Sequence, residues 1–306
     1  MSKSESEKNS QQWSSYNKQY QQIMALIPSV FSKVAISLLL PSLDTSTDAI
    51  RLVDIAAGPG VFNKVLFQHM VESNKQFPAG SRFLVTDFAS GMVETAKNSL
   101  LELDLASIGA PALDFRVVDA CDPHDIEDGT YTHMVCMFGI MFFPHRAQAL
   151  RRLLGKLETG KGRVVFGSWC TTATVQLCNE FGLHVDPTAQ SKRPPLETSP
   201  LSVCADPSVF KQELLEAGFT HVEVVQRDQE FEIPNDDSLF AVLFTNPAIL
   251  GMYPEFSSQV IPTDVLWQKW QEFLHGDAGH KWLRVDAGHQ EVVVLYYQAN
   301  LAFGLA

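Results

Sequence analysis

Short apolar runs alternate with longer helical repeats along the chain from residue 50 onward. Five of the runs are predicted to be strands, because they are rich in β-branched and aromatic residues and are bounded by polar or glycine-containing turns. They are Arg51–Ala56, Arg82–Thr86, Phe115–Val118, His133–Met137 and Arg163–Trp169. Strands that alternate with helices at this spacing predict parallel βαβ units, and therefore an α/β sheet covered by helices on both faces.

The segments between these runs carry apolar residues three or four positions apart, which is the period of a helix. Phe62, Leu66 and Met70 mark the first such segment. Val93, Ala96 and Leu100 mark the second, and Ala147, Leu150, Leu154 and Leu157 the third. A fourth helix is predicted to begin at Asp206-Pro207, since an aspartate can cap it and proline fits its first position. Gly218 should end that helix.

The rhythm changes after Trp169. Residues 170–205 hold several prolines among serines and threonines, and we expect a helix there followed by an irregular lid. Residues 219–231 and 291–302 are rich in β-forming residues and would complete a Rossmann-like, seven-stranded, mostly parallel sheet. Between them, residues 234–286 are predicted to form a helical insertion, with Leu266, Trp270 and Phe273 on one helix face.

The first fifty residues divide into two parts. Residues 1–12 are hydrophilic and are expected to be a disordered tail, whereas residues 13–49 should form a helical cap on the body. The stretch Ile23–Leu40 is apolar, but prolines, serines and a lysine break it, so packing on the body is a better interpretation than a membrane span. No signal-peptide pattern is evident, and we expect a cytoplasmic protein.

Composition narrows the possible partners. The 306 residues, 45% apolar and 19% charged, can form a packed core, and residues 50–306 fit one decorated domain better than two. The formal charge of −12 argues against a broad nucleic-acid surface, so small molecules or proteins are the expected partners. Five cysteines without paired spacing predict free thiols and no metal site.

Aspartates follow three successive predicted strands. Asp54 precedes the turn that contains Gly58 and Gly60, Asp87 follows the second strand, and Asp119 follows the third. In an open α/β sheet the carboxyl ends of the strands form the ligand crevice. Three carboxylates in that crevice would suit a ligand that has ribose hydroxyls, an amine and a positive charge.

This pattern resembles that of the class I S-adenosylmethionine-dependent methyltransferases, in motif detail over residues 13–170. The resemblance implies an S-adenosyl-L-methionine site, with Asp54 in the first motif, Asp87 on the ribose hydroxyls and Asp119 at the adenine amine. Ala56 stands where the family commonly has its first glycine. Trp13 and Tyr20 have the W-x6-Y spacing of an N-terminal segment that closes over the cofactor in many small-molecule members. The cofactor-binding residues implied in this way are Trp13, Tyr20, Asp54, Ala56, Gly58, Gly60, Asp87, Phe88, Met92, Asp119, Ala120 and Met137.

A dinucleotide cofactor fits the same residues less well. The dinucleotide fingerprint needs a third glycine at the helix start, but position 63 is Asn. The acidic residue expected about 20 positions beyond the glycines is also missing, since Asp87 lies 87 − 60 = 27 residues after Gly60.

The acceptor is less well defined than the cofactor. Methionine and aromatic residues that could line the mouth favour a small apolar or aromatic acceptor; they are Met141, Phe142, Phe143, Trp169, Met252, Tyr253 and Phe256. His145 is a weak candidate for a general base, with His275, His280 and His289 as rivals. A protein or peptide methyltransferase and a non-catalytic cofactor-binding scaffold stay open as alternatives.

Overall fold

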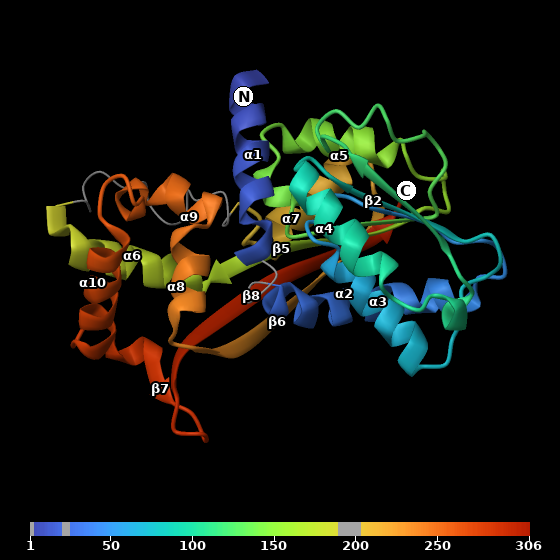
Figure 1. Cartoon of the computed structure of the whole chain (residues 1–306). Coiled ribbons are helices and arrows are strands. Elements are labelled where there is room, and N and C mark those ends of the chain that lie inside the picture. The colour runs from blue at the N-terminus through green and yellow to red at the C-terminus, as the bar shows by residue number, and fades with distance from the viewer. Residues whose placement is uncertain (1–2, 20–24, 189–202) are drawn as a thin grey trace.

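A mixed sheet runs through the middle of the molecule, and helices cover both of its faces (Figure 1). The computed structural model describes residues 3–19, 25–188 and 203–306. The strands are β1 (Arg51–Asp54), β2 (Arg82–Asp87), β3 (Ala112–Val117), β4 (His133–Met137), β5 (Arg163–Thr172), β6 (Thr220–Pro234), β7 (Leu283–Val285) and β8 (Glu291–Leu305). Their order in the sheet is β3-β2-β1-β4-β5-β8-β6, and β7 pairs with β8.

Strands β1 to β5 are parallel, and β8 lies antiparallel between β5 and β6. The predicted Rossmann-like, mostly parallel sheet is therefore confirmed, with the short strand β7 as an addition. The strand order reverses at β1, whose neighbours are β2 on one side and β4 on the other. Ligands of open α/β sheets bind at such a reversal, beyond the carboxyl ends of the strands.

Helices cover both faces of the parallel part of the sheet. The helices are α1 (Lys3–Gln19), α2 (Leu26–Thr45), α3 (Val61–Glu72), α4 (Ser90–Leu101), α5 (Arg146–Leu154), α6 (Ala173–Val185), α7 (Pro207–Ala217), α8 (Asp237–Phe244), α9 (Pro247–Met252) and α10 (Thr263–His275). Helices α2, α3 and α4 cover one face, and α5 and α7 cover the other, while the remaining helices lie outside these two layers. Val165 of β5 packs with α2, α3 and α4, whereas Val164 and Phe166 pack with α5 and α7. This alternation follows from the two-residue period of a strand.

Helix α7 follows the cap chemistry of its sequence. The Asp206 carboxylate accepts hydrogen bonds from the Ser208 and Val209 amides, Pro207 opens the helix, and Gly218 ends it with φ of 108°. Although a serine at the start of a helix can act as its cap, Ser90 is already helical, and Ala89 is the cap residue of α4. The Ala89 amide donates to the Asp87 carboxylate instead.

A second core lies under the helical insertion between β6 and β8. Helices α8, α9 and α10 pack with α6 and the far end of β8 around a cluster of aromatic rings. Trp270 and Phe273 are fully buried in it, and Phe181 of α6 contacts both rings. Residues 170–205, expected to contain an irregular lid, begin with the end of β5 and with α6; residues 189–202 lie outside the described part of the chain.

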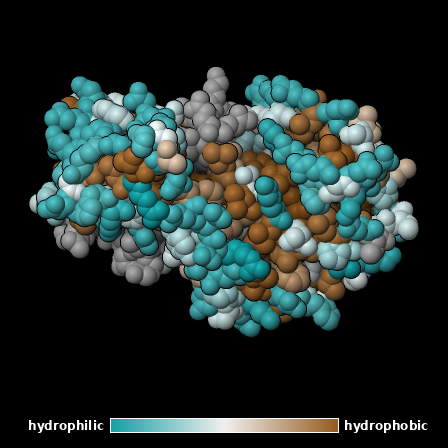
Figure 2. Space-filling view, turned by 90° about the horizontal axis from the view of Figure 1, so that it is seen from below, coloured by the Kyte–Doolittle hydropathy of each residue, from teal (hydrophilic) through white to brown (hydrophobic). Residues whose placement is uncertain are grey.

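Helix α2 is apolar on nearly every side. It is the one helix in the described ranges that is long and apolar enough to cross a membrane by composition. It packs on α3 and β5, which agrees with the prediction that this apolar segment packs on the body of the protein. Figure 2 shows apolar residues gathered on the face seen from below, where α2 and α3 lie, and Val34, Leu38 and Leu40 of α2 are half-buried there.

Helix α1 begins at Lys3, so most of the segment expected to be a disordered tail is helical. Although its sequence is hydrophilic, α1 has a face that packs on the body. Ser10, Trp13 and Ser14 lie on this face because they are spaced three or four residues apart. Ser10 Oγ donates to the Phe88 carbonyl at 2.9 Å, and the Gly91 amide donates to Ser14 Oγ at 3.1 Å. At the other end, Tyr16 OH donates to the Val242 carbonyl at 2.9 Å, so α1 connects the start of α4 with α8 of the insertion.

The contact between α1 and α4 should depend on the missing side chain of Gly91. A Cβ at this position would lie 2.7 Å from the Ser14 carbonyl oxygen. We predict that Gly91→Ala weakens the docking of α1 by about 1–3 kcal/mol, which would raise amide exchange of residues 3–19 roughly tenfold or more. Hydrogen exchange read by mass spectrometry measures this. Gly251→Ala is the matched control, since nothing lies within 4 Å of its added Cβ. Equal exchange of α1 in both variants would contradict the prediction.

Candidate active site

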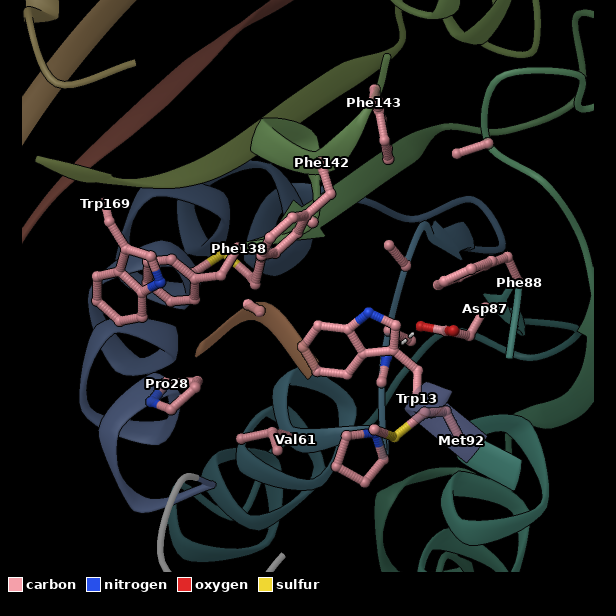
Figure 3. Close-up of a pocket in the computed structure, with 18 of the residues that line it drawn as sticks. Trp13, Pro28, Val61, Asp87, Phe88, Met92, Phe138, Phe142, Phe143 and Trp169 are labelled. Carbon is pink, nitrogen blue, oxygen red and sulfur yellow. Dashed lines mark hydrogen bonds between the residues drawn. The ribbon is translucent and has the colours of Figure 1, made fainter. Parts of the chain in front are cut away.

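One cavity opens at the carboxyl ends of β1, β2, β4 and β5, where the strand order reverses, and it has two arms (Figure 3). The acidic arm lies over β1, β2 and the loop after β3. It is lined by Asp54, Ala56, Ala57, Gly58, Pro59, Asp87, Phe88, Met92, Val118, Asp119, Ala120 and Cys121. The apolar arm lies towards the insertion. It is lined by Pro28, Ser32, Trp169, Thr172, Thr174, Val175, Asn246, Ala248, Ile249 and Tyr297.

Asp54 is the last residue of β1, and its side chain is buried. One carboxylate oxygen, Oδ2, accepts a hydrogen bond from Asn63 Nδ2 at 2.6 Å, whereas Oδ1 has no partner. Burial raises the pKa of Asp54 well above its ordinary value, and the charge of Asp87 raises it further. An unpaired buried carboxylate oxygen is costly, so a ligand that donates hydrogen bonds or carries positive charge would be stabilised here.

Asp87 ends β2, and its carboxylate connects two turns. Its Oδ2 accepts from the Gly58 amide and its Oδ1 from the Ala89 amide, both at 2.9 Å. Burial raises the pKa of Asp87 to about 6, although these amide hydrogen bonds act in the opposite direction. Each carboxylate oxygen has a further lone pair, and Figure 3 shows the carboxylate facing the cavity. Asp87 can therefore still accept hydrogen bonds from a ligand's hydroxyl groups.

Asp119 lies two residues beyond β3 and is exposed at the edge of the acidic arm. Its Oδ1 accepts from the Cys121 amide at 2.8 Å. Ala120, Phe88 and Met92 line the cavity near it, and Figure 3 shows the Phe88 ring beside Asp87. Two apolar side chains and an acceptor at the rim form a slot that suits a flat heterocycle with an exocyclic amine.

The two glycines of the turn after β1 have different purposes. Gly58 has φ of 55°, and an added Cβ would meet no atom within 4 Å, so its backbone is open to the cavity. Gly60 does not line the cavity, and the expectation that it approaches a ligand is not supported by its position. A Cβ at Gly60 would lie 3.2 Å from both Ala96 and Leu100, so this glycine lets α3 and α4 pack together.

Ala56 stands in the left-handed region with φ of 52° and lines the acidic arm. A Cβ at Gly139 would lie 2.5 Å from Ala56 Cβ, so the methyl group of Ala56 fills the space that Gly139 leaves. Phe138 beside it is also left-handed, with φ of 62°. Strained backbone of this kind is concentrated at functional sites, and here it brings the loop after β4 against the turn after β1.

Met137 and Trp13 both line the cavity. The Trp13 ring meets the Phe142 ring edge-on at 5.9 Å, and Figure 3 shows its indole lying between Asp87 and Val61. Tyr20 lies outside the described residues. Tyr16, three residues after Trp13, is buried against the insertion and was not predicted. Its i, i+3 spacing from Trp13 was the available signal.

The apolar arm was largely missed by the sequence analysis. Only Trp169 was named among its residues, together with Phe142 and Phe143 at the mouth. Its wall is aromatic, because the Phe138 and Trp169 rings stack at 3.7 Å and the Tyr297 ring lies 5.2 Å from Trp169. Tyr253 and Phe256, expected at the mouth, are buried in the aromatic cluster of the insertion instead. The arm draws on α2, β5, α6, α9 and β8, a combination that no local pattern marks.

None of the four candidate histidines lines the cavity. His145 is the exposed cap residue of α5, and His275 pairs with Glu291 at 2.9 Å on the insertion. His280 binds the Asp277 carbonyl. We therefore assign no general base to a histidine. Across residues 3–19, 25–188 and 203–306 the structure places no three His, Cys, Asp or Glu side chains together as metal ligands.

Comparison with solved structures finds the same fold, whereas comparison of sequences finds no match. No protein-family model matches the chain, and no curated protein matches it. The YcgJ protein from Bacillus subtilis is similar over 89% of this chain and 97% of its own, with a TM-score of 0.51 and 14% identity. A methyltransferase candidate from Bacillus halodurans is similar over 88% of this chain and 96% of its own, with a TM-score of 0.50 and 14% identity. The chain therefore shares the Rossmann-like methyltransferase fold of these structures.

The acidic arm should bind a nucleoside that carries an ammonium group less tightly at low pH. A ligand ammonium favours the ionised carboxylates, and protonation of Asp87, with a pKa of about 6, removes one of them. Affinity is then full above this pKa and is lost as the pH falls through it. Between pH 7.5 and 5.5 we predict a loss of up to about fourfold in the affinity for S-adenosylhomocysteine from Asp87, measured by calorimetry. Asp87→Asn should reduce this dependence. An affinity that is constant or rises towards pH 5.5 would contradict the prediction.

The fit between Ala56 and Gly139 predicts a coupled pair. Gly139→Ala should lower the free energy of unfolding by about 1–3 kcal/mol, because its methyl group would collide with that of Ala56. Ala56→Gly in the same chain should recover most of the loss, since it removes the other methyl group. Denaturant unfolding of the two single variants and the double variant measures the coupling. Additive effects would show that the contact is not the cause.

Proposed function

We propose that the protein is an S-adenosylmethionine-dependent methyltransferase that acts on a small apolar or aromatic acceptor. The observation that supports this most is the continuity of the cavity. Three aspartates from three successive strands meet in its acidic arm, and the apolar arm begins directly beside them. A cofactor in the first arm and an acceptor in the second would share one enclosed space.

The residues of the acidic arm fit the cofactor. The unpartnered Oδ1 of Asp54 is placed for an ammonium group, and the open backbone at Gly58 admits a ligand without a Cβ in the way. Asp87 keeps lone pairs for ribose hydroxyls, and Phe88, Met92 and Asp119 line the part of the arm that would hold adenine. When bound, the cofactor supplies a methyl group already activated by its positive sulfur.

The chain's own contribution is to position the reactants and exclude water. Holding two reactants at roughly 3–3.5 Å in line can account for most of the acceleration of such a transfer. Trp13 and Phe142 cover the mouth, and the Phe138–Trp169 pair forms a wall of the apolar arm. Cys121 is the one thiol among the described lining residues, and burial raises its pKa to about 11, so it is a poor base at neutral pH.

A small acceptor fits this enclosure better than a peptide segment. Helix α1 contacts both α4 and α8, and α9 also contacts α1. A bound peptide would have to displace these contacts. We place the reaction in the cytoplasm, in keeping with five cysteines that are all free thiols.

The test combines cofactor binding with turnover. We expect the purified protein to bind S-adenosylhomocysteine. We also expect it to convert S-adenosylmethionine to S-adenosylhomocysteine when a suitable acceptor is present, as tested with a panel of phenols, amines, thiols and carboxylic acids. Asp87→Ala should weaken S-adenosylhomocysteine binding about 10- to 100-fold, because hydrogen bonds to a charged group are each worth about 1.5–3 kcal/mol.

Asp122→Ala is the matched control, because this exposed aspartate is close to Asp119 but does not line the cavity. Thermal unfolding of both variants separates lost binding from lost fold. An S-adenosylhomocysteine affinity that is the same in Asp87→Ala and in the unchanged protein would contradict the cofactor assignment. Methylation of basic peptides without methylation of any small acceptor would contradict the acceptor class.

A further inference from the structure

The apolar arm contains no charged side chain among the described residues that line it. Its polar groups are hydroxyls and one amide, which belong to Ser32, Thr172, Thr174, Asn246 and Tyr297. A carboxylate, a phosphate or an ammonium group placed in this arm would lose its water and find no opposite charge among these lining residues. Burial of an unpaired charge is far more costly than burial of a neutral polar group.

Most of the arm's polar groups already have protein partners. Thr174 Oγ1 and Tyr297 OH are hydrogen-bonded to each other, and Asn246 Oδ1 accepts from the Ala248 amide at 2.9 Å. These contacts connect the start of α6 to β8 and close the turn before α9. They explain how polar residues are tolerated in a wall that is otherwise aromatic and aliphatic.

Ser32 is different, because its hydroxyl is buried and has no partner. The residue is fully buried in α2, lies one turn after Pro28, and lines the cavity as Pro28 does. Two residues that line this cavity have a buried side-chain atom without a partner in the described part of the chain: Asp54 in the acidic arm and Ser32 in the apolar arm. An unsatisfied buried hydroxyl needs an explanation, and a ligand atom would supply it.

The surroundings of Ser32 indicate what kind of ligand this is. Figure 3 shows Pro28 and Trp169 facing each other at the end of the cavity away from Asp87. Phe31 of α2 packs edge-on against Phe138 and Trp169, with ring centroids at 5.8 and 5.4 Å, so the aromatic wall and α2 are joined directly. A flat ring system fits a wall of this kind.

We propose that the acceptor is an uncharged molecule with an aromatic or conjugated ring, and that its hydroxyl or carbonyl group is recognised by Ser32. This inference rests on the proposed function and defines the acceptor class of the same site. Ser32 acts as a specificity-determining residue: it can donate to a carbonyl or accept from a hydroxyl. The absence of charge among the described residues that line the apolar arm selects against acids, phosphate esters and protonated amines of the same size.

Three probes of equal ring size test the charge rule: 2-naphthol, 2-naphthoate and 2-naphthylmethylammonium. Calorimetry at pH 7 with the full chain and saturating S-adenosylhomocysteine measures their affinities. We expect 2-naphthol to bind at least about tenfold more tightly than either charged probe, because each charge would be buried unpaired. Equal or tighter binding of a charged probe, or no binding of 2-naphthol, overturns the inference.

Ser32→Ala tests the recognising group. The variant should weaken 2-naphthol about three- to tenfold, the worth of one neutral hydrogen bond. It should leave S-adenosylhomocysteine binding unchanged, because Ser32 lies in the other arm. Ser29→Ala is the matched control on the same helix, since Ser29 Oγ donates to the Leu26 carbonyl and does not line the cavity. Unchanged 2-naphthol affinity in Ser32→Ala overturns the role of Ser32.

The experiments distinguish a failure of the proposed function from a failure of the proposed acceptor class. A protein that does not bind S-adenosylhomocysteine contradicts the proposed function itself. A protein that binds S-adenosylhomocysteine normally but prefers charged probes keeps the proposed function and contradicts only the acceptor class.

Discussion

The carboxylate of Asp87 connects the two turns on which the site depends. It accepts hydrogen bonds from the amides of Gly58 and Ala89, so the glycine turn after β1 and the start of α4 are held by one side chain. The same junction is supported from below, where Thr86 Oγ1 donates to the Asp54 carbonyl and the Ala57 amide donates to the Thr86 carbonyl. These hydrogen bonds fix the distance between the carboxyl ends of β1 and β2, and the acidic arm depends on that distance.

In the ligand-free protein, this junction has a cost in free energy because it buries two carboxyl groups. Burial raises the pKa of both Asp54 and Asp87, and the Asp87 charge adds to the effect on Asp54. Two buried carboxyl groups that resist ionisation make a poor structural element but a good receptor for positive charge. Their placement is therefore easier to explain by a ligand than by stability of the fold alone.

The sequence allowed prediction of the sheet and the acidic arm, because both are local in the chain. Each strand, its following turn and its aspartate lie within a few residues, and parallel strands necessarily bring their ends to one edge. The apolar arm could not be predicted in this way, since Ser32, Asn246 and Tyr297 come from distant segments. Gly60 was misjudged because a turn glycine can serve a ligand or a neighbouring helix, and only the position of Ala96 decides between them. The sequence analysis placed the start of the N-terminal helical segment too late. The contacts of α1 join serine hydroxyl groups to backbone atoms, and a search for hydrophobic periodicity does not detect such contacts.

The fit of Ala56 against Gly139 has a consequence for sequence variation among related chains. A methyl group at one position excludes a methyl group at the other, so a chain with glycine at the first position is free to carry a side chain at the second. The two positions should thus change together over evolution, although they are separated by more than eighty residues. A covarying glycine pair of this kind would trace the contact between the turn after β1 and the loop after β4 in chains whose structures are unknown.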